Sequence, residues 1–243
     1  MSPARVVRSA DVRQLLTDLD TQLGALGDRS TASIRRLRRT MSRSLRGASA
    51  DLVLHLATAL IARDGSADRF IAYELVAAHP DARATLGPAR LRKLGQGMDS
   101  WSDVDMFGCY LAGPAWHAKL ISNAEIARWT RSRDRWWRRA ALVATVGLNA
   151  RARAANQRGD RNTPDAERTL AVCRRLMADR DPMVVKAMSW ALRELSKHSP
   201  AAVSRFVREN AAELPALVRR EVNAKLTTGL KTPRRSRSAA KPG

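Results

Sequence analysis

Residues 134–141, DRWWRRAA, and residues 181–188, DPMVVKAM, can be laid over one another. In both stretches an acidic residue is followed five residues later by a basic residue and then by alanine. Residues 217–220, LVRR, form a third and poorer copy. Around these copies, apolar residues recur at intervals of three and four, whereas the alternation typical of strands is rare. The sequence therefore predicts an all-α fold that contains a repeated helical unit.

Cap residues and breaks in the apolar pattern predict where the helices begin and end. The predicted starts are Ser9, Thr31, Ser49, Ser66, the segment from Asp81 to Leu91, Ser100, Ser122, Asp134, Thr163, Asp181, Ser199 and Leu214. Glycines that are predicted to separate helices are Gly27, Gly65, Gly95, Gly113, Gly147 and Gly159. Paired helices of this length resemble HEAT repeats, which stack side by side. We therefore predict a curved α-solenoid of HEAT-like helical repeats.

Two polar segments bound the predicted domain. Residues 156–163, NQRGDRNT, have the composition of a surface loop. Residues 232–243, TPRRSRSAAKPG, are basic and rich in proline and serine, which predicts a flexible tail. The sequence thus predicts one domain over residues 1–231 and a basic tail over residues 232–243.

The charge of the chain indicates a polyanionic partner. The 44 lysines and arginines outnumber the 23 acidic residues and give a formal net charge of +21. Nucleic acid is the leading candidate, because basic residues release counterions from phosphates. A membrane surface or an acidic protein is an alternative, although no apolar run approaches the roughly 18–20 residues of a spanning helix. No secretory signal is recognisable at the start, so we expect a cytoplasmic, nucleoid-associated protein without membrane contact.

The residues that usually bind metals or cofactors form no recognisable motif. Cys109 and Cys173 each fall in an apolar helical pattern, which favours buried thiols over a disulfide. The four histidines are scattered, and none has a cysteine or histidine at ligand spacing. No glycine-rich phosphate loop of the GxxxxGK type occurs. We expect no metal and no cofactor.

The basic positions of the repeated unit suggest a binding surface. If the second helix of each pair lines a concave wall, Arg139, Lys186 and Arg219 would form a positive track on which a duplex backbone could lie. Alternatively, such residues pair with acids of neighbouring repeats and only hold the stack together. With a surplus of 21 positive charges, however, they cannot all be paired within the chain.

The acidic stretch 99–105, DSWSDVD, is unusual in so basic a chain. Its bland interpretation is a helix N-terminus, where Asp and Ser satisfy free N–H groups. On a helix, however, Trp101 and Asp105 share one face because they are four residues apart, and Lys186 and Trp190 share a face in the same way. These side chains and Arg139 could converge on the concave side. Each also has a structural interpretation, as core tryptophans and ion-pair partners.

Three segments carry a resemblance to a known family. Residues 101–105 (WSDVD), 136–141 (WWRRAA) and 186–194 (KAMSWALRE) resemble, in order and separation, successive motifs of the AlkD-type alkylpurine DNA glycosylases. The resemblance is clear from about Leu91 to Leu226 and faint before that, where only the helical pattern and the segment from Asp68 to His79 are comparable. It implies a HEAT-like solenoid that embraces duplex DNA and excises alkylated purines.

The resemblance also implies roles for four residues. Asp105 would stabilise the positive charge that develops on the deoxyribose and orient the attacking water. Trp101 and Trp190 would cradle the cationic lesion with their aromatic faces. Arg139 would bind a backbone phosphate near the lesion and help to keep Asp105 ionised. The chain departs from the family motif at Ser100, Ser102 and Asp103.

On this basis the sequence predicts a monomeric, monofunctional DNA glycosylase that hydrolyses the N-glycosidic bond of N3- or N7-alkylated purines in double-stranded DNA, for base excision repair. Further predicted contacts to the DNA backbone are Arg135, Arg138, Lys186, Arg193, Arg219 and Lys225. One alternative is a HEAT-like protein that binds DNA without catalysis. Another is a protein-interaction solenoid for an acidic partner.

Overall fold

The computed structural model describes residues 9–28, 30–63, 65–156 and 165–232. Within these ranges the regular structure is helical and no strand occurs, which confirms the prediction of an all-α fold. The helices are α1 (Ser9–Gly24), α2 (Thr31–Ser44), α3 (Ala50–Ile61), α4 (Ser66–Ala78), α5 (Pro80–Ala84), α6 (Pro88–Leu94), α7 (Trp101–Met106), the π-helix η1 (Phe107–Ala112), α8 (Gly113–His117), α9 (Asn123–Trp129), α10 (Arg135–Asn156), α11 (Ala166–Leu176), α12 (Pro182–Leu195), α13 (Pro200–Glu209) and α14 (Ala216–Thr228).

Local capping chemistry decides most of the helix starts. The side chains of Ser49, Ser100, Ser122 and Asp181 each accept a hydrogen bond from a backbone N–H in the first turn of the helix that follows. These bonds satisfy donors that have no partner within the helix. The predicted starts at these four residues are therefore confirmed.

Some of the predicted features fall elsewhere or outside the described ranges. The segment from Asp81 to Leu91 contributes to two short helices, α5 and α6, each with proline in its first turn. The start at Thr163, the break at Gly159, residues 157–163 of the predicted loop and residues 233–243 of the predicted tail lie outside the described residues.

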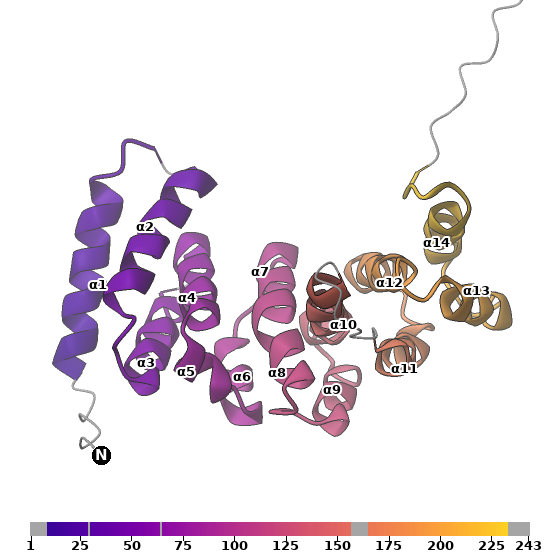
Figure 1. The fold of residues 1–243 in the computed structure, drawn as a ribbon, viewed down its shortest axis with the longest axis horizontal. Coiled ribbons are helices and arrows are strands. Elements are labelled where there is room, and N and C mark those ends of the chain that lie inside the picture. The colour runs from indigo at the N-terminus through magenta and orange to yellow at the C-terminus, as the bar shows by residue number, and fades with distance from the viewer. Residues whose placement is uncertain (1–8, 29, 64, 157–164, 233–243) are drawn as a thin grey trace, which may run out of the picture.

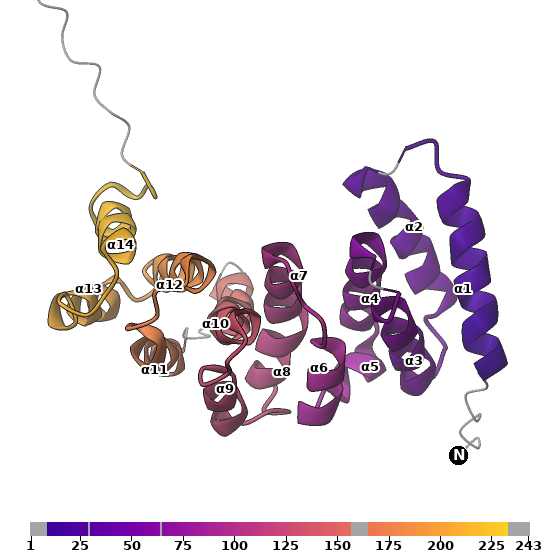
Figure 2. The ribbon, with the colours of Figure 1, turned by 180° about the vertical axis from the view of Figure 1, so that it is seen from behind.

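The helices follow one another along an arc, with both ends of the described chain bent toward the same side (Figure 1). Helices α2, α4, α7, α10, α12 and α14 form an inner row, in which each helix packs on the next. The outer row consists of α1, α3, α5, α6, α9, α11 and α13, as the reverse view also shows (Figure 2). The elements η1 and α8 continue α7. The inner row is the concave side of the arc.

The sequence prediction was wrong for two glycines. Gly113 and Gly147 do not separate helices: Gly113 is the first residue of α8, which continues η1 without a break, and Gly147 lies within α10. A β-carbon added at Gly113 would lie 2.5 Å from the backbone of Gly147. Glycine at these positions allows two helices to cross with their backbones almost in contact. Such a close approach is invisible to a rule that treats glycine as a helix stop.

Apolar side chains between the two rows form one continuous core. Near its middle, the buried ring of Phe107 lies 5.7 Å from that of Trp137 and 5.8 Å from that of Trp129, between ring centroids. Cys109 and Cys173 form no disulfide with each other, and Cys173 is fully buried in the core. Among the described residues, no helix is both long and apolar enough to cross a membrane.

Candidate active site

Helix α7 presents one indole and one carboxylate at the inner row. The Ser100 hydroxyl caps the helix by accepting a hydrogen bond from the Asp103 N–H at 3.2 Å. Trp101, in the first turn, is 60% exposed, although the indole is one of the largest apolar side chains. Asp105 follows one turn later and is partly buried, with 21% of its side chain exposed. The two side chains share a helix face, as the spacing of four predicts.

Arg139 of α10 binds the Asp105 carboxylate in a bidentate manner. Its Nε donates to Oδ1 at 3.0 Å, and its Nη2 donates to Oδ1 at 2.7 Å and to Oδ2 at 3.0 Å. The arginine is only 5% exposed. A planar guanidinium matches a carboxylate in this way, and a lysine ammonium does not. The pair therefore fixes both the position and the orientation of Asp105.

Burial and the guanidinium act on the Asp105 carboxyl in opposite directions. Partial burial disfavours the charged form and raises the pKa, while the charge and the hydrogen bonds of Arg139 lower it. Burial is the larger effect, so the pKa of Asp105 lies above the ordinary value for aspartate. The result is a carboxylate with few water contacts and one fixed cationic partner.

Arg139 also connects this carboxylate to α12. Its Nη1 donates to the Met183 carbonyl, in the first turn of α12, at 2.6 Å. Trp190 lies seven residues after Met183, which is two turns further along the same helix face. Its indole is partly buried and packs against the core. The Arg139 side chain thus links α10 to both helices that carry the predicted tryptophans.

The second carboxylate of α7 has a structural environment. Asp103 is 8% exposed, and its Oδ2 lies 3.7 Å from Nε of Arg69, which is itself 4% exposed. Arg69 also donates to the carbonyls of Gln96 and Gly97, at 3.0 and 3.1 Å. These contacts hold the connection between α6 and α7 against α4. Asp103 therefore stabilises the start of α7. Of the acids in residues 99–105, Asp105 is the one that Arg139 binds.

Two of the predicted DNA contacts are engaged in ion pairs between neighbouring helices. Arg138 donates from Nε to Asp179 at 2.7 Å. The exposed Arg135 lies over the Trp136 ring, 5.0 Å from its centroid, and 3.6 Å from a carboxylate oxygen of Asp181. One alternative interpretation of the basic residues is that they pair with acids of neighbouring repeats and hold the stack together. This applies above all to Arg138, whose side chain is largely buried and bound to Asp179.

The other predicted contacts differ in how free they are. Arg193 is mostly buried, with its Nε 3.7 Å from Glu221, and the Lys225 ammonium binds a backbone carbonyl at the end of α14. Lys186 and Arg219 are exposed, and no ion pair engages either of them within the described part of the chain. These two cations are therefore available to an external anion.

The predicted positive track is wrong in one respect. Arg139 and Lys186 occupy equivalent positions of the repeat, five residues after Asp134 and Asp181, and both acids accept a hydrogen bond from a backbone N–H two residues later, at 2.8 Å. Yet Arg139 is buried against Asp105, while Lys186 is exposed. Helix α7 supplies a carboxylate to Arg139, whereas none of the described residues supplies one to Lys186. A shared position in a repeat does not ensure a shared environment.

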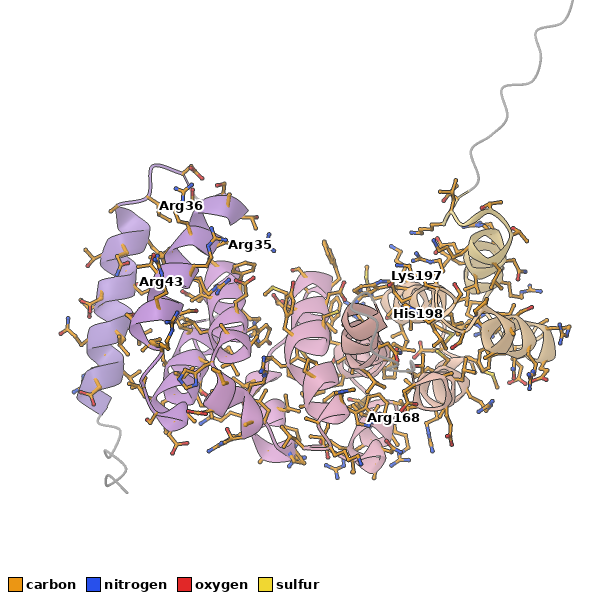
Figure 3. The ribbon with its side chains drawn as sticks, viewed as in Figure 1. Arg35, Arg36, Arg43, Arg168, Lys197 and His198 are labelled. Atoms are coloured by element: carbon orange, nitrogen blue, oxygen red, sulfur yellow. The ribbon has the colours of Figure 1, made fainter. Side chains whose placement is uncertain are left out.

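A basic surface on α2 was missed by the sequence analysis. Residues 31–50 contain six arginines and no acid. Arg36, Arg39 and Arg43 are exposed, and Arg35 lies over the Phe70 ring, 5.4 Å from its centroid. Figure 3 shows Arg35 and Arg36 near the upper end of α2 and Arg43 lower down. The acid-free run of arginines was the signal that would have identified this surface.

Among the described residues, no group of three or more His, Cys, Asp or Glu side chains is arranged to hold a metal ion. On the concave side of this basic chain, the structure brings the Asp105 carboxylate onto the buried guanidinium of Arg139, with the exposed Trp101 on the same helix as Asp105. Such a set can hold a cationic group beside the carboxylate and phosphates on the surrounding cations.

A comparison with known protein families agrees with the chemistry of this candidate site. The model of a family described as DNA alkylation repair enzyme matches residues 24–226. The match begins in α1, well before Leu91, where the resemblance in sequence motifs becomes clear. No curated protein matches the chain. Because the matched segment spans most of the chain and includes the whole candidate site, the protein belongs to the DNA alkylation repair enzyme family.

Proposed function

We propose that the protein is a monofunctional DNA glycosylase that hydrolyses the N-glycosidic bond of N3- or N7-alkylated purines in duplex DNA. The observation that carries the proposal is the Asp105 carboxylate, partly buried and held by three hydrogen bonds from Arg139 on the concave side of a chain with a net charge of +21. A basic surface alone would bind DNA. An anion that is fixed within it suits a substrate that becomes positive during the reaction.

The chemistry of the substrate requires little from the enzyme. Alkylation at N3 or N7 gives the purine a formal positive charge, so the base departs as a neutral molecule with the electrons of the C1′–N bond. Positive charge then develops on the deoxyribose, and a water molecule attacks C1′ and loses a proton. The products are the free alkylpurine, an abasic site and one proton.

Asp105 is assigned to the positive sugar. A carboxylate beside C1′ would stabilise the oxocarbenium-like transition state and orient the attacking water, as a carboxylate does in glycoside hydrolysis. Its partial burial strengthens this interaction, because charges interact more strongly where water is excluded. Arg139 holds the carboxylate in place and favours its ionised form.

The two tryptophans are assigned to the lesion. The face of an indole attracts a cation by about 0.5–2 kcal/mol, depending on how much water is removed. The 60% exposure of Trp101 leaves its ring available to a ligand. Trp190 would face the lesion from α12, because it lies on the helix that Arg139 links to Asp105.

Binding of the duplex is assigned to the exposed cations of the inner row, above all Lys186 and Arg219. We propose that the two rows of helices are HEAT-like repeats that curve around the DNA. The protein would act as a monomer. We assign no covalent intermediate, because Lys186 is placed as a phosphate contact and water is the nucleophile. A nucleoid-associated protein in the cytoplasm follows from this function.

The experiment is the release of 7-methylguanine or 3-methyladenine from methylated duplex DNA under single-turnover conditions. We expect the wild-type protein to release the base, to leave the strand intact and to form no adduct with DNA on borohydride reduction. A protein that binds duplex DNA but releases no base would be a DNA-binding member of the family without catalysis. One with no salt-dependent affinity for DNA would support the protein-interaction solenoid.

Asp105→Asn tests the assigned residue, with Asp99→Asn as the matched control because Asp99 is an exposed acid that precedes the same helix. A unit charge at about 4 Å and an effective dielectric constant of about 20 contributes about 4 kcal/mol. The release rate should therefore fall roughly 10³-fold, with little change in duplex affinity. Release by Asp105→Asn at the rate of the control would remove Asp105 from the mechanism.

A further inference from the structure

The π-helix η1 begins two residues after Asp105 and crosses α10 at very short range. A β-carbon placed on Gly108 would lie 2.6 Å from Cγ1 of Val143, 2.8 Å from its Cβ and 3.1 Å from the backbone nitrogen of Ala144. Both Gly108 and Val143 are buried, so neither can move toward solvent to relieve such a contact. This crossing is possible only because residue 108 has no side chain.

The crossing has a defined register with the candidate site. Gly108 follows Asp105 by three residues and Val143 follows Arg139 by four, so each pair lies about one turn apart on its own helix. The contact of Gly108 with Val143 and the ion pair of Asp105 with Arg139 are therefore consecutive contacts along the same two helices. The distance between the backbones at the first contact sets the distance available at the second.

The approach is reciprocal. The carbonyl oxygen of Gly108 lies 2.6 Å from the place that a β-carbon on Gly147 would occupy. Each helix thus contributes a glycine where the other helix's backbone passes. A π-helical turn widens the helix and alters the direction of the residues beside it, and such turns are frequent at functional sites. Here the π-helical turn begins directly after the last turn of α7, which carries Asp105.

We propose that Gly108 is a positioning residue for base excision: its lack of a side chain lets η1 approach α10 closely enough for Arg139 to bind Asp105 in a bidentate manner. The inference rests on the proposed function and deepens it, because it assigns the precision of the catalytic carboxylate to a backbone contact one turn away. Gly108 itself touches no substrate.

A methyl group at this position would force the two helices apart. The obstacles are the Cβ of Val143 and the backbone nitrogen of Ala144, and neither can rotate out of the way. Closely packed interiors transmit such a displacement to their neighbours. The Nη2–Oδ1 bond of 2.7 Å would lengthen, and a misplacement of the order of 1 Å in a catalytic group lowers rates by up to about 100-fold.

The first test compares Gly108→Ala with Gly87→Ala, a control at a glycine whose added β-carbon meets no atom within 4 Å. The measurements are the single-turnover release of 7-methylguanine and the equilibrium affinity for the same duplex. We expect Gly108→Ala to lower the release rate about 10- to 100-fold while affinity changes less than about twofold. A release rate for Gly108→Ala equal to that of Gly87→Ala would overturn the proposal.

A compensating variant separates positioning from general destabilisation. Adding Val143→Gly to Gly108→Ala removes the two nearest obstacles and moves the glycine to the other helix of the crossing. It also deletes a buried side chain and places glycine within a helix, so the double variant should unfold at a lower temperature than Gly108→Ala. We nevertheless expect it to recover most of the release rate. A rate that falls further, together with the unfolding temperature, would contradict a positioning role.

A third measurement does not depend on catalysis, and so distinguishes failure of this inference from failure of the proposed function. Asp105→Asn, Arg139→Gln and their combination form a double-mutant cycle, whose unfolding free energies give the coupling between the two side chains. We expect that coupling to be large in the wild-type background and to be mostly lost when Gly108→Ala is present. A coupling that Gly108→Ala leaves unchanged would refute the positioning role, even if the protein released no alkylated base.

Discussion

Replacement of Arg139 by glutamine distinguishes two roles that the sequence alone left together: binding a phosphate and holding Asp105. The guanidinium makes three hydrogen bonds to the carboxylate and a fourth to the Met183 carbonyl, and is 5% exposed. Its donors are thus directed into the protein. We therefore expect Arg139→Gln to act on the rate of excision and not on the binding of DNA.

The magnitude follows from these contacts. Loss of one partner of a buried ion pair lowers stability by about 3–5 kcal/mol, and we expect the lower end because Asp105 retains 21% exposure. The carboxylate also loses the bonds that orient it, so the release rate should fall roughly 10- to 100-fold near neutral pH. The loss should be greater at acidic pH. Without the guanidinium, burial raises the pKa of Asp105 further, and the inactive protonated form persists to higher pH.

The assay is the single-turnover release of 7-methylguanine as a function of pH, together with duplex affinity as a function of salt. Arg133→Gln is the matched control, because Arg133 is an exposed arginine just before the same helix. We expect the acid limb of the rate profile to move to higher pH in Arg139→Gln, with affinity and its salt dependence unchanged. Weaker binding with a shallower salt dependence, and an unmoved acid limb, would mean that Arg139 binds phosphate and does not act through Asp105.

Three further predictions address the other assigned residues. Asp103→Asn should lower the free energy of unfolding by about 1–3 kcal/mol, because it removes the charge of a carboxylate that faces the buried Arg69. Folded protein should still release bases at the wild-type rate, and a large loss of rate would show that Asp105 is the wrong carboxylate. Lys186→Gln and Arg219→Gln should each reduce the slope of log affinity against log salt by about 1, as measured by fluorescence anisotropy, and an unchanged slope would remove that residue from the DNA surface. Trp101→Ala should change the unfolding free energy by less than about 0.5 kcal/mol, since the ring is largely exposed. It should nevertheless slow release about 2- to 30-fold, because the attraction of the indole to the cationic base is lost. Release at the wild-type rate would assign the indole no role in excision.

The linear sequence predicted the features that depend on neighbouring residues. Caps at Ser49, Ser100, Ser122 and Asp181 begin helices where the sequence places them, because a side-chain oxygen and the N–H that it satisfies are only two or three residues apart. The shared face of Trp101 and Asp105 follows in the same way from the periodicity of the helix.

Features that depend on the approach of distant segments could not be predicted in this way. Gly113 and Gly147 were expected to end helices, and instead they allow two helices to cross. Arg139 and Lys186 have equivalent places in the repeat, but within the described ranges only Arg139 meets a carboxylate, from a helix more than thirty residues away in the chain. Asp103 was distinguished from Asp105 by Arg69, which no local pattern connects to it.

By itself, the sequence determined that this chain is helical, where most of its helices begin and which tryptophan and aspartate share a face, because backbone capping and helical periodicity act over four residues or fewer. Only the tertiary structure decided which basic residue is paired and which is available, and which acid is fixed beside the tryptophan. These outcomes depend on how closely η1, α10 and α12 pack. Where η1 and α8 cross α10, that closeness is allowed by the absence of side chains at Gly108, Gly113 and Gly147, a property that has meaning only once the helices meet.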